Sequence, residues 1–113
     1  MVCRMWHGWT TLENARAYEC YLKEELFPRV ERELRVRGYR GFQLLTMQQR
    51  SEVEFVTMLW FDSIDDVKSF AGSSYTVPVI SAKARSLLAH YAEHADHFDL
   101  TGASWPEFVT QKN

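Results

Sequence analysis

The segment 53–61 constrains the fold most, because a strand drawn through it is apolar on both sides. At the two-residue period of a strand, one side carries Val53, Phe55, Thr57, Leu59 and Phe61, and the other carries Val56, Met58 and Trp60. A strand with one face in water alternates apolar and polar residues, so two apolar faces indicate cover on both sides. The segment is predicted to be a central strand of its sheet.

A helix is predicted to follow at once, over residues 64–72. Asp62 or Ser63 can cap its N-terminus, where Asp65 and Asp66 add favourable negative charge. The glycine at the end of this segment is a common helix stop. The apolar residues recur at three-to-four spacing and predict one buried side, made of Ile64, Val67, Phe70 and Ala71.

The N-terminal part predicts a strand over residues 2–9 and then a long helix. Thr10 and Glu13 have the spacing of a capping box, in which the two side chains satisfy free backbone N–H groups reciprocally. Apolar residues at helical spacing predict its inward side, made of Ala15, Tyr18, Leu22 and Leu26. Pro28 lacks a backbone donor and crowds the preceding turn, so a kink or a new helix start is expected there.

The remaining segments predict a hairpin, a short helix and a last strand. A strand over residues 42–49 joins the central strand through a tight turn, which makes the two strands neighbours. A short helix is expected at 82–89, capped by Ser81, after an irregular stretch around Pro78. The final strand, 91–100, is the most polar one and is expected at a sheet edge.

The order of these elements predicts an α+β fold of the ferredoxin-like βαββαβ pattern, with two helices on one face of a four-stranded antiparallel sheet. The other face keeps apolar side chains, and exposing Trp6 or Trp60 there would create an unusually large apolar patch. A second copy is the simplest cover, so a homodimer with face-to-face sheets is predicted. Residues 1–100 form this domain, and the tail 101–113 is expected to dock on it or on the partner through Trp105 and Phe108.

Composition excludes several other classes of protein. The chain has 113 residues, 46% of them hydrophobic and 14% aromatic, which is enough for the core of one domain. A formal net charge of -2 with interspersed signs gives no basic stripe, so nucleic acid and membrane surfaces are not expected as partners. No signal-peptide or membrane-span pattern is present, which favours a cytoplasmic protein. Cys3 and Cys20 lack metal-ligand spacing and are expected to be small buried hydrophobes.

Several short segments together carry a resemblance to a known family: 4–10, 38–41, 54–57, 62–63, 70–72, 84–88 and 97–99. In order and spacing they resemble the antibiotic biosynthesis monooxygenase (ABM) domain family over roughly the first hundred residues. The resemblance implies a dimeric α+β barrel. It also implies oxidation of an aromatic substrate by molecular oxygen without metal or organic cofactor, in a pocket between the sheet and the helices of each protomer.

Such a reaction needs a proton acceptor, because a phenol or anthrone must lose a proton to become electron-rich in a dry cavity. His7 is the first candidate, since it shares with Met5 and Trp9 the strand face that is expected to line the pocket. His97 is the second candidate and would lie near His7 if the last strand pairs with the first. Asp99 could then orient one of the two imidazoles.

The same resemblance suggests substrate-binding residues, each of which could equally belong to the core. The expected pocket wall consists of aromatic side chains: Trp60, Phe70, Tyr75 and Tyr18. Arg4, and more weakly Arg85, would hold an anionic group of a small aromatic or hydrophobic substrate.

Two other kinds of site are not expected. A branch of the family degrades haem with an Asn, a Trp and a His, whose positions fall on His7, Phe70 and Ile80 here. The His- and acid-rich segment 90–97 matches no metal-ligand motif. The alternative function is of a different class, namely a non-catalytic dimeric module that binds a small hydrophobic ligand or assists a partner enzyme.

Overall fold

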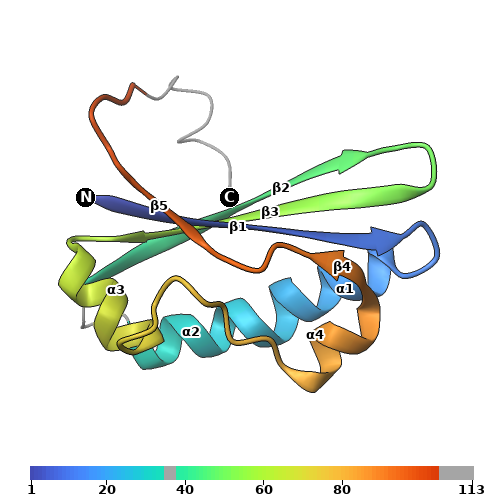
Figure 1. Ribbon diagram of the computed structural model, residues 1–113, viewed down its shortest axis with the longest axis horizontal. Helices are drawn as coiled ribbons and strands as arrows, with labels where there is room; N and C mark the ends of the chain where they lie inside the picture. The colour runs from blue at the N-terminus through green and yellow to red at the C-terminus, as the bar shows by residue number, and fades with distance from the viewer. Residues whose placement is uncertain (35–37, 105–113) are drawn as a thin grey trace.

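The computed structural model describes residues 1–34 and 38–104 and has an α+β fold, in which helices cover one face of an antiparallel sheet (Figure 1). The strands are β1 (Val2–Thr11), β2 (Tyr39–Gln48), β3 (Glu52–Phe61), β4 (Leu88–Tyr91) and β5 (Asp96–Asp99). Their order is β2-β3-β1-β4, and β5 also pairs with β1. The predicted hairpin of β2 and β3 is confirmed, and so is the central position of β3.

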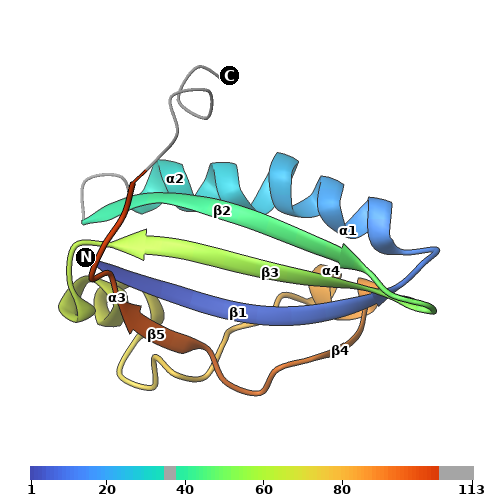
Figure 2. The same ribbon diagram turned by 90° about the horizontal axis from the view of Figure 1, so that it is seen from above.

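The last strand differs from the prediction, because it consists of two short strands along one edge of β1 (Figure 2). Between them, the carbonyl of Ala92 accepts a hydrogen bond of 2.8 Å from the indole of Trp6. The backbone N–H of Ala95 donates a hydrogen bond of 2.8 Å to the carbonyl of Thr76, and Ala95 is buried. Because of these contacts, the backbone between β4 and β5 does not continue the regular hydrogen-bond pattern with β1. The predicted single strand 91–100 is therefore not formed.

The long first helix consists of α1 (Ala15–Tyr21), a π-helical turn (Leu22–Leu26) and α2 (Phe27–Leu34). In this turn the N–H of Phe27 bonds to the carbonyl of Leu22, five residues back. The wider turn lies directly before Pro28, whose ring would crowd the carbonyl four residues back in a regular α-helix. The expected interruption at Pro28 therefore takes the form of a π-helical turn, and the helix continues through it.

The predicted start of the first helix at Thr10 is wrong. Thr10 is fully buried within β1, which runs to Thr11. The hydroxyl of Thr11 accepts a hydrogen bond of 3.1 Å from the N–H of Asn14, and α1 begins only after that turn. Pairing with β3 extends the strand over the residues that local chemistry assigned to a capping box.

The caps of α3 (Ile64–Ala71) and α4 (Ala82–Leu87) confirm the predictions for the second half of the chain. The Ser63 hydroxyl accepts from the N–H of Asp66 at 3.3 Å, and the Ser81 hydroxyl accepts from the N–H of Ala84 at 3.1 Å. Gly72 ends α3 at a φ of 87°, which is costly for residues with a Cβ. No helix in the described part of the chain is long and apolar enough to cross a membrane.

The core lies between the sheet and the helices. Its most deeply buried side chains come from both layers: Tyr18, Leu22, Phe27, Phe55, Phe61 and Val67. The rings of Tyr18 and Phe55 meet edge to face, with centroids 4.9 Å apart. Cys3 is buried as expected, but the same expectation is wrong for Cys20, which is exposed on α1.

The opposite side of the sheet carries no helix in the described residues (Figure 1), and we call it the open face. The strand register places both apolar and polar side chains on it: Cys3, Met5, His7 and Trp9 of β1, Gln43, Leu45 and Met47 of β2, Glu52, Glu54, Val56, Met58 and Trp60 of β3, His90 of β4, and Asp96 and Phe98 of β5. Trp60 is on this face as predicted, whereas Trp6 lies on the helix side. Trp105 and Phe108, the expected docking residues of the tail, fall outside the described residues.

Candidate functional site

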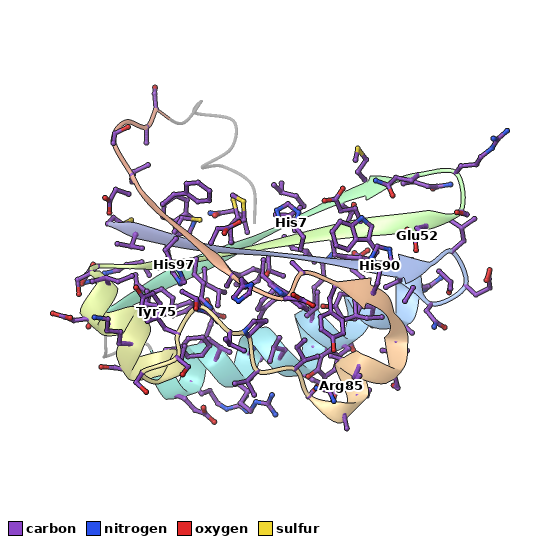
Figure 3. The ribbon with its side chains drawn as sticks, in the orientation of Figure 1. His7, Glu52, Tyr75, Arg85, His90 and His97 are labelled. Atoms are coloured by element: carbon purple, nitrogen blue, oxygen red, sulfur yellow. The ribbon has the colours of Figure 1, made fainter. Side chains whose placement is uncertain are left out.

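Four of the predicted site residues meet on the helix side of the sheet, around Arg4. Arg4 in β1 is 7% exposed, and Nη1 lies 3.1 Å from Nε2 of His97 in β5. The same Nη1 donates to the carbonyl of Tyr75, in the segment between α3 and α4. The Phe70 ring of α3 lies with its centroid 5.8 Å from Cζ of Arg4. Figure 3 shows His97 and Tyr75 close together near α3.

The strand register explains why Arg4 and His97 meet. His97 is the direct partner of Arg4 in the antiparallel pairing of β1 with β5, so both side chains project from the same face. The Tyr75 ring packs edge-on against the His97 ring, with centroids 5.1 Å apart. The N–H of Ala95 fixes the neighbouring segment by its bond to Thr76. The cluster therefore joins β1 and β5 to the segment that follows α3.

The electrostatics of this cluster favour a neutral imidazole. Burial first, and then the positive charge of Arg4, lower the pKa of His97, while Asp96 acts in the opposite direction. Burial also lowers the pKa of Arg4, but a guanidinium has no acceptor and stays protonated near neutral pH. Nε2 of His97 must therefore accept the hydrogen bond, which leaves the proton of the neutral ring on Nδ1.

His7 lies on the open face, so its expected position in a pocket under the helices is wrong. Its Nδ1 is 2.8 Å from Oε2 of Glu54 in β3, and the two side chains are 33% and 16% exposed. Because His7 and His97 project from opposite faces of the sheet, the expected proximity of the two histidines is also wrong. The alternation along β1 gives the helix side to Arg4 and the open face to His7.

A second contact between a histidine and a glutamate lies beside His7 on the open face. Trp9 stacks on His90 of β4, with centroids 4.6 Å apart and planes within 9°, and its other neighbour is His7 at 6.1 Å. Nε2 of His90 is 3.0 Å from both carboxylate oxygens of Glu52. Sequence reasoning missed both glutamates, although acids at alternate positions of an otherwise apolar strand are a usable signal.

The other predicted residues do not join the Arg4 cluster. Trp60 lies on the open face and donates to the amide oxygen of Gln43, while Tyr18 of α1 is buried against Phe55 of β3. Arg85 is exposed on α4, away from His97 (Figure 3). Asp99 pairs with Val2, and no hydrogen bond among the described residues connects it with either candidate base.

The grooves of the surface lie elsewhere. A groove of about 760 Å³ runs between α1 and the hairpin end of β2 and β3, over Leu12, Ala15, Thr46, Val53 and Phe55. A smaller one of about 430 Å³ lies between α2 and the start of β2. Neither groove is lined by any residue of the Arg4 cluster or by a histidine. The Arg4 cluster therefore lies outside both grooves.

Within residues 1–34 and 38–104, no group of three or more His, Cys, Asp or Glu side chains is arranged to hold a metal ion. No family model matches the sequence, and the search of curated proteins gives no significant match. The α+β fold is thus established by the structure, and the resemblance to the ABM family stays a prediction.

Proposed function

We propose that this chain is a cofactor-independent monooxygenase that oxidises a small aromatic or quinol-type compound with molecular oxygen. The observation that supports this most is the 3.1 Å contact between Arg4 and His97 in a buried, aromatic-walled position. Nδ1 carries the proton of the neutral imidazole, so a substrate hydroxyl must take the place of Arg4 at Nε2 before Nε2 can accept its proton. The adjacent guanidinium can then stabilise the anion that forms. His97 is thus the proposed base, in place of His7, and Arg4 holds the oxyanion.

The remaining chemistry comes from the substrate. With an anthrone, His97 takes a proton and the resulting electron-rich anion reacts with oxygen. One ring CH₂ becomes C=O, one oxygen atom of O₂ enters the product, and the other leaves as water with the two hydrogens. The substrate carbon supplies all four electrons, so the protein needs to supply only a base, an anion site and walls such as Phe70 and Tyr75 that exclude water.

Membership of the ABM family, with its ferredoxin-like βαββαβ topology, is part of the same proposal. In that topology β4 and β5 together would take the place of the fourth strand, because both pair with the same edge of β1. The open face supports a face-to-face homodimer, since Leu45, Met47 and Phe98 are each about half exposed there. A cytoplasmic location also stays a prediction.

The proposal is tested by oxygen uptake of metal-stripped protein with anthrones, naphthols and quinols. We expect His97→Gln to lower the rate by about 10²–10⁴-fold, because Gln keeps an acceptor for Arg4 but cannot take a proton. His94→Gln is the control, since His94 is exposed and outside the cluster. Loss of activity in His7→Gln with full activity in His97→Gln would instead assign the base to the His7–Glu54 pair. Absence of uptake with every compound would reject an oxygenase.

The second candidate function is a non-catalytic dimeric module that binds a small hydrophobic ligand or assists a partner enzyme. The groove of about 760 Å³ favours it, because apolar side chains such as Val53 and Phe55 line it beside charged ones and no candidate base does. Thr46 is exposed in this groove on β2. If a hydrophobic ligand raises the melting temperature without oxygen uptake, Thr46→Trp should fill the groove and abolish that shift.

A further inference from the structure

We infer that the ligand of the Arg4 cluster is an aromatic carboxylate, bound by the Nε–Nη2 edge of the guanidinium. This inference rests on the proposed function, because it names the ligand class of the same site. Nη1 makes both recorded contacts of Arg4, with the Tyr75 carbonyl and with His97. Nε and Nη2 have no partner among the described residues, and they are not among the fully buried unpartnered atoms. Each of these two nitrogens therefore keeps some contact with solvent, although the side chain as a whole is buried.

The charge of Arg4 is also uncompensated, in contrast to the cations on the surface. Arg40, Lys23 and Lys83 are exposed, and each is within 2.6 Å of a carboxylate oxygen. Arg4 is the one charged side chain that is buried in the described part of the chain, and none of the ion pairs there includes it. A buried charge without a counter-ion is unfavourable, so a bound anion would be strongly favoured at this position.

The geometry of the free edge selects the kind of anion. Nε and Nη2 present two parallel N–H donors, which match the two coplanar oxygens of a carboxylate better than the single oxygen of a phenolate. Aromatic rings belong to this cluster, since the Phe70 centroid lies 5.8 Å from Cζ of Arg4 and the Tyr75 ring packs on the His97 ring. An aromatic ring attached to the carboxylate would pack against them, and a ring hydroxyl would lie near His97.

The test compares benzoate and salicylate with benzamide, the neutral analogue of the same shape, by calorimetry and thermal shift on the full chain. We expect the two acids to bind at least about tenfold more tightly than benzamide, because only they place a negative charge opposite the guanidinium. Arg4→Lys keeps the positive charge but lacks the two parallel N–H donors of a guanidinium. It should weaken benzoate binding by about tenfold or more. Arg29→Lys, on the exposed side of α2, is the matched control.

Equal binding of benzamide and benzoate, unchanged binding in Arg4→Lys, or no binding of either acid would overturn this inference. The comparison of ligands on the wild-type chain decides the question even if Arg4→Lys does not fold. Oxygen uptake separates the two proposals. Binding of the acids without oxygen uptake would reject the oxygenase and retain the carboxylate site. Oxygen uptake with anthrones but no binding of the acids would retain the oxygenase and reject the carboxylate site.

Discussion

Nη1 of Arg4 lies 3.1 Å from Nε2 of His97, although 93 positions separate the two residues in the chain. The contact exists because β5 pairs with the outer edge of β1 and places the two residues directly opposite each other. Tyr75 completes it from a third region of the chain, through its carbonyl. The candidate site is therefore assembled only when the first strand, the last strand and the segment after α3 have all folded together.

The depressed pKa of His97 predicts a pH dependence of stability. In the unfolded chain the imidazole takes up a proton as the pH falls below about 6.5, whereas burial and Arg4 oppose this uptake in the folded protein. The free energy of unfolding should therefore fall with decreasing pH, until the pH reaches the lower pKa of the folded state. Urea denaturation at about pH 7.5 and about pH 5 should show a smaller loss for His97→Gln than for wild type. Parallel losses in the two proteins, with His94→Gln as control, would contradict this.

The sequence predicted best what depends on neighbouring residues. The hairpin of β2 and β3 follows from two apolar runs joined by a short polar turn, and the cap at Ser63 and the stop at Gly72 are local chemistry. These features need no knowledge of the rest of the fold. The predicted start of the first helix was wrong, because pairing of Thr10 with Val53 outweighed the local capping signal.

The candidate site was harder to predict, because β1 is apolar on both faces. The alternation along β1 shows that Arg4 and His7 project from opposite sides of the sheet. It does not show which of these two side chains points toward the helices. A histidine can take a proton near neutral pH and an arginine cannot, so the sequence favoured His7 as the base and left Arg4 as a substrate-binding candidate. His97 was recognised as a candidate, but its partner depends on the register of β5, which no local pattern specifies.

The N-cap of α3 predicts a measurable loss of stability in Ser63→Ala. The Ser63 hydroxyl accepts from the N–H of Asp66 at 3.3 Å and lies 2.9 Å from its carboxylate. Its removal should cost about 1 kcal/mol and lower the melting temperature by several degrees. Ser69→Ala, at an exposed position of the same helix, should leave the melting temperature unchanged or slightly higher. Equal effects of the two variants would show that the cap contributes nothing.

The two cysteines should differ in their reactivity towards a thiol reagent such as Ellman's. Cys20 is exposed, whereas Cys3 is 4% exposed and burial raises the pKa of its thiol. Because the thiolate is the reacting species, native protein should show one fast thiol and one that reacts only after unfolding. Cys20→Ser should remove the fast phase, and Cys3→Ser should retain it. A fast phase that survives Cys20→Ser would mean that β1 opens readily at this edge.

The open face predicts that a charge introduced on it will disrupt the proposed homodimer. Leu45 in β2 is 50% exposed and projects from the same face as Val56, its partner in β3. Leu45→Glu should leave the monomer folded but weaken association by about a hundredfold or more, because the carboxylate would lose its hydration in the interface. Sedimentation velocity gives the stoichiometry of each variant. Val79→Glu is the matched control, since Val79 is 91% exposed and outside the sheet. A Leu45→Glu protein that stays dimeric would place the contact on another surface, and a monomeric wild type would reject the homodimer itself.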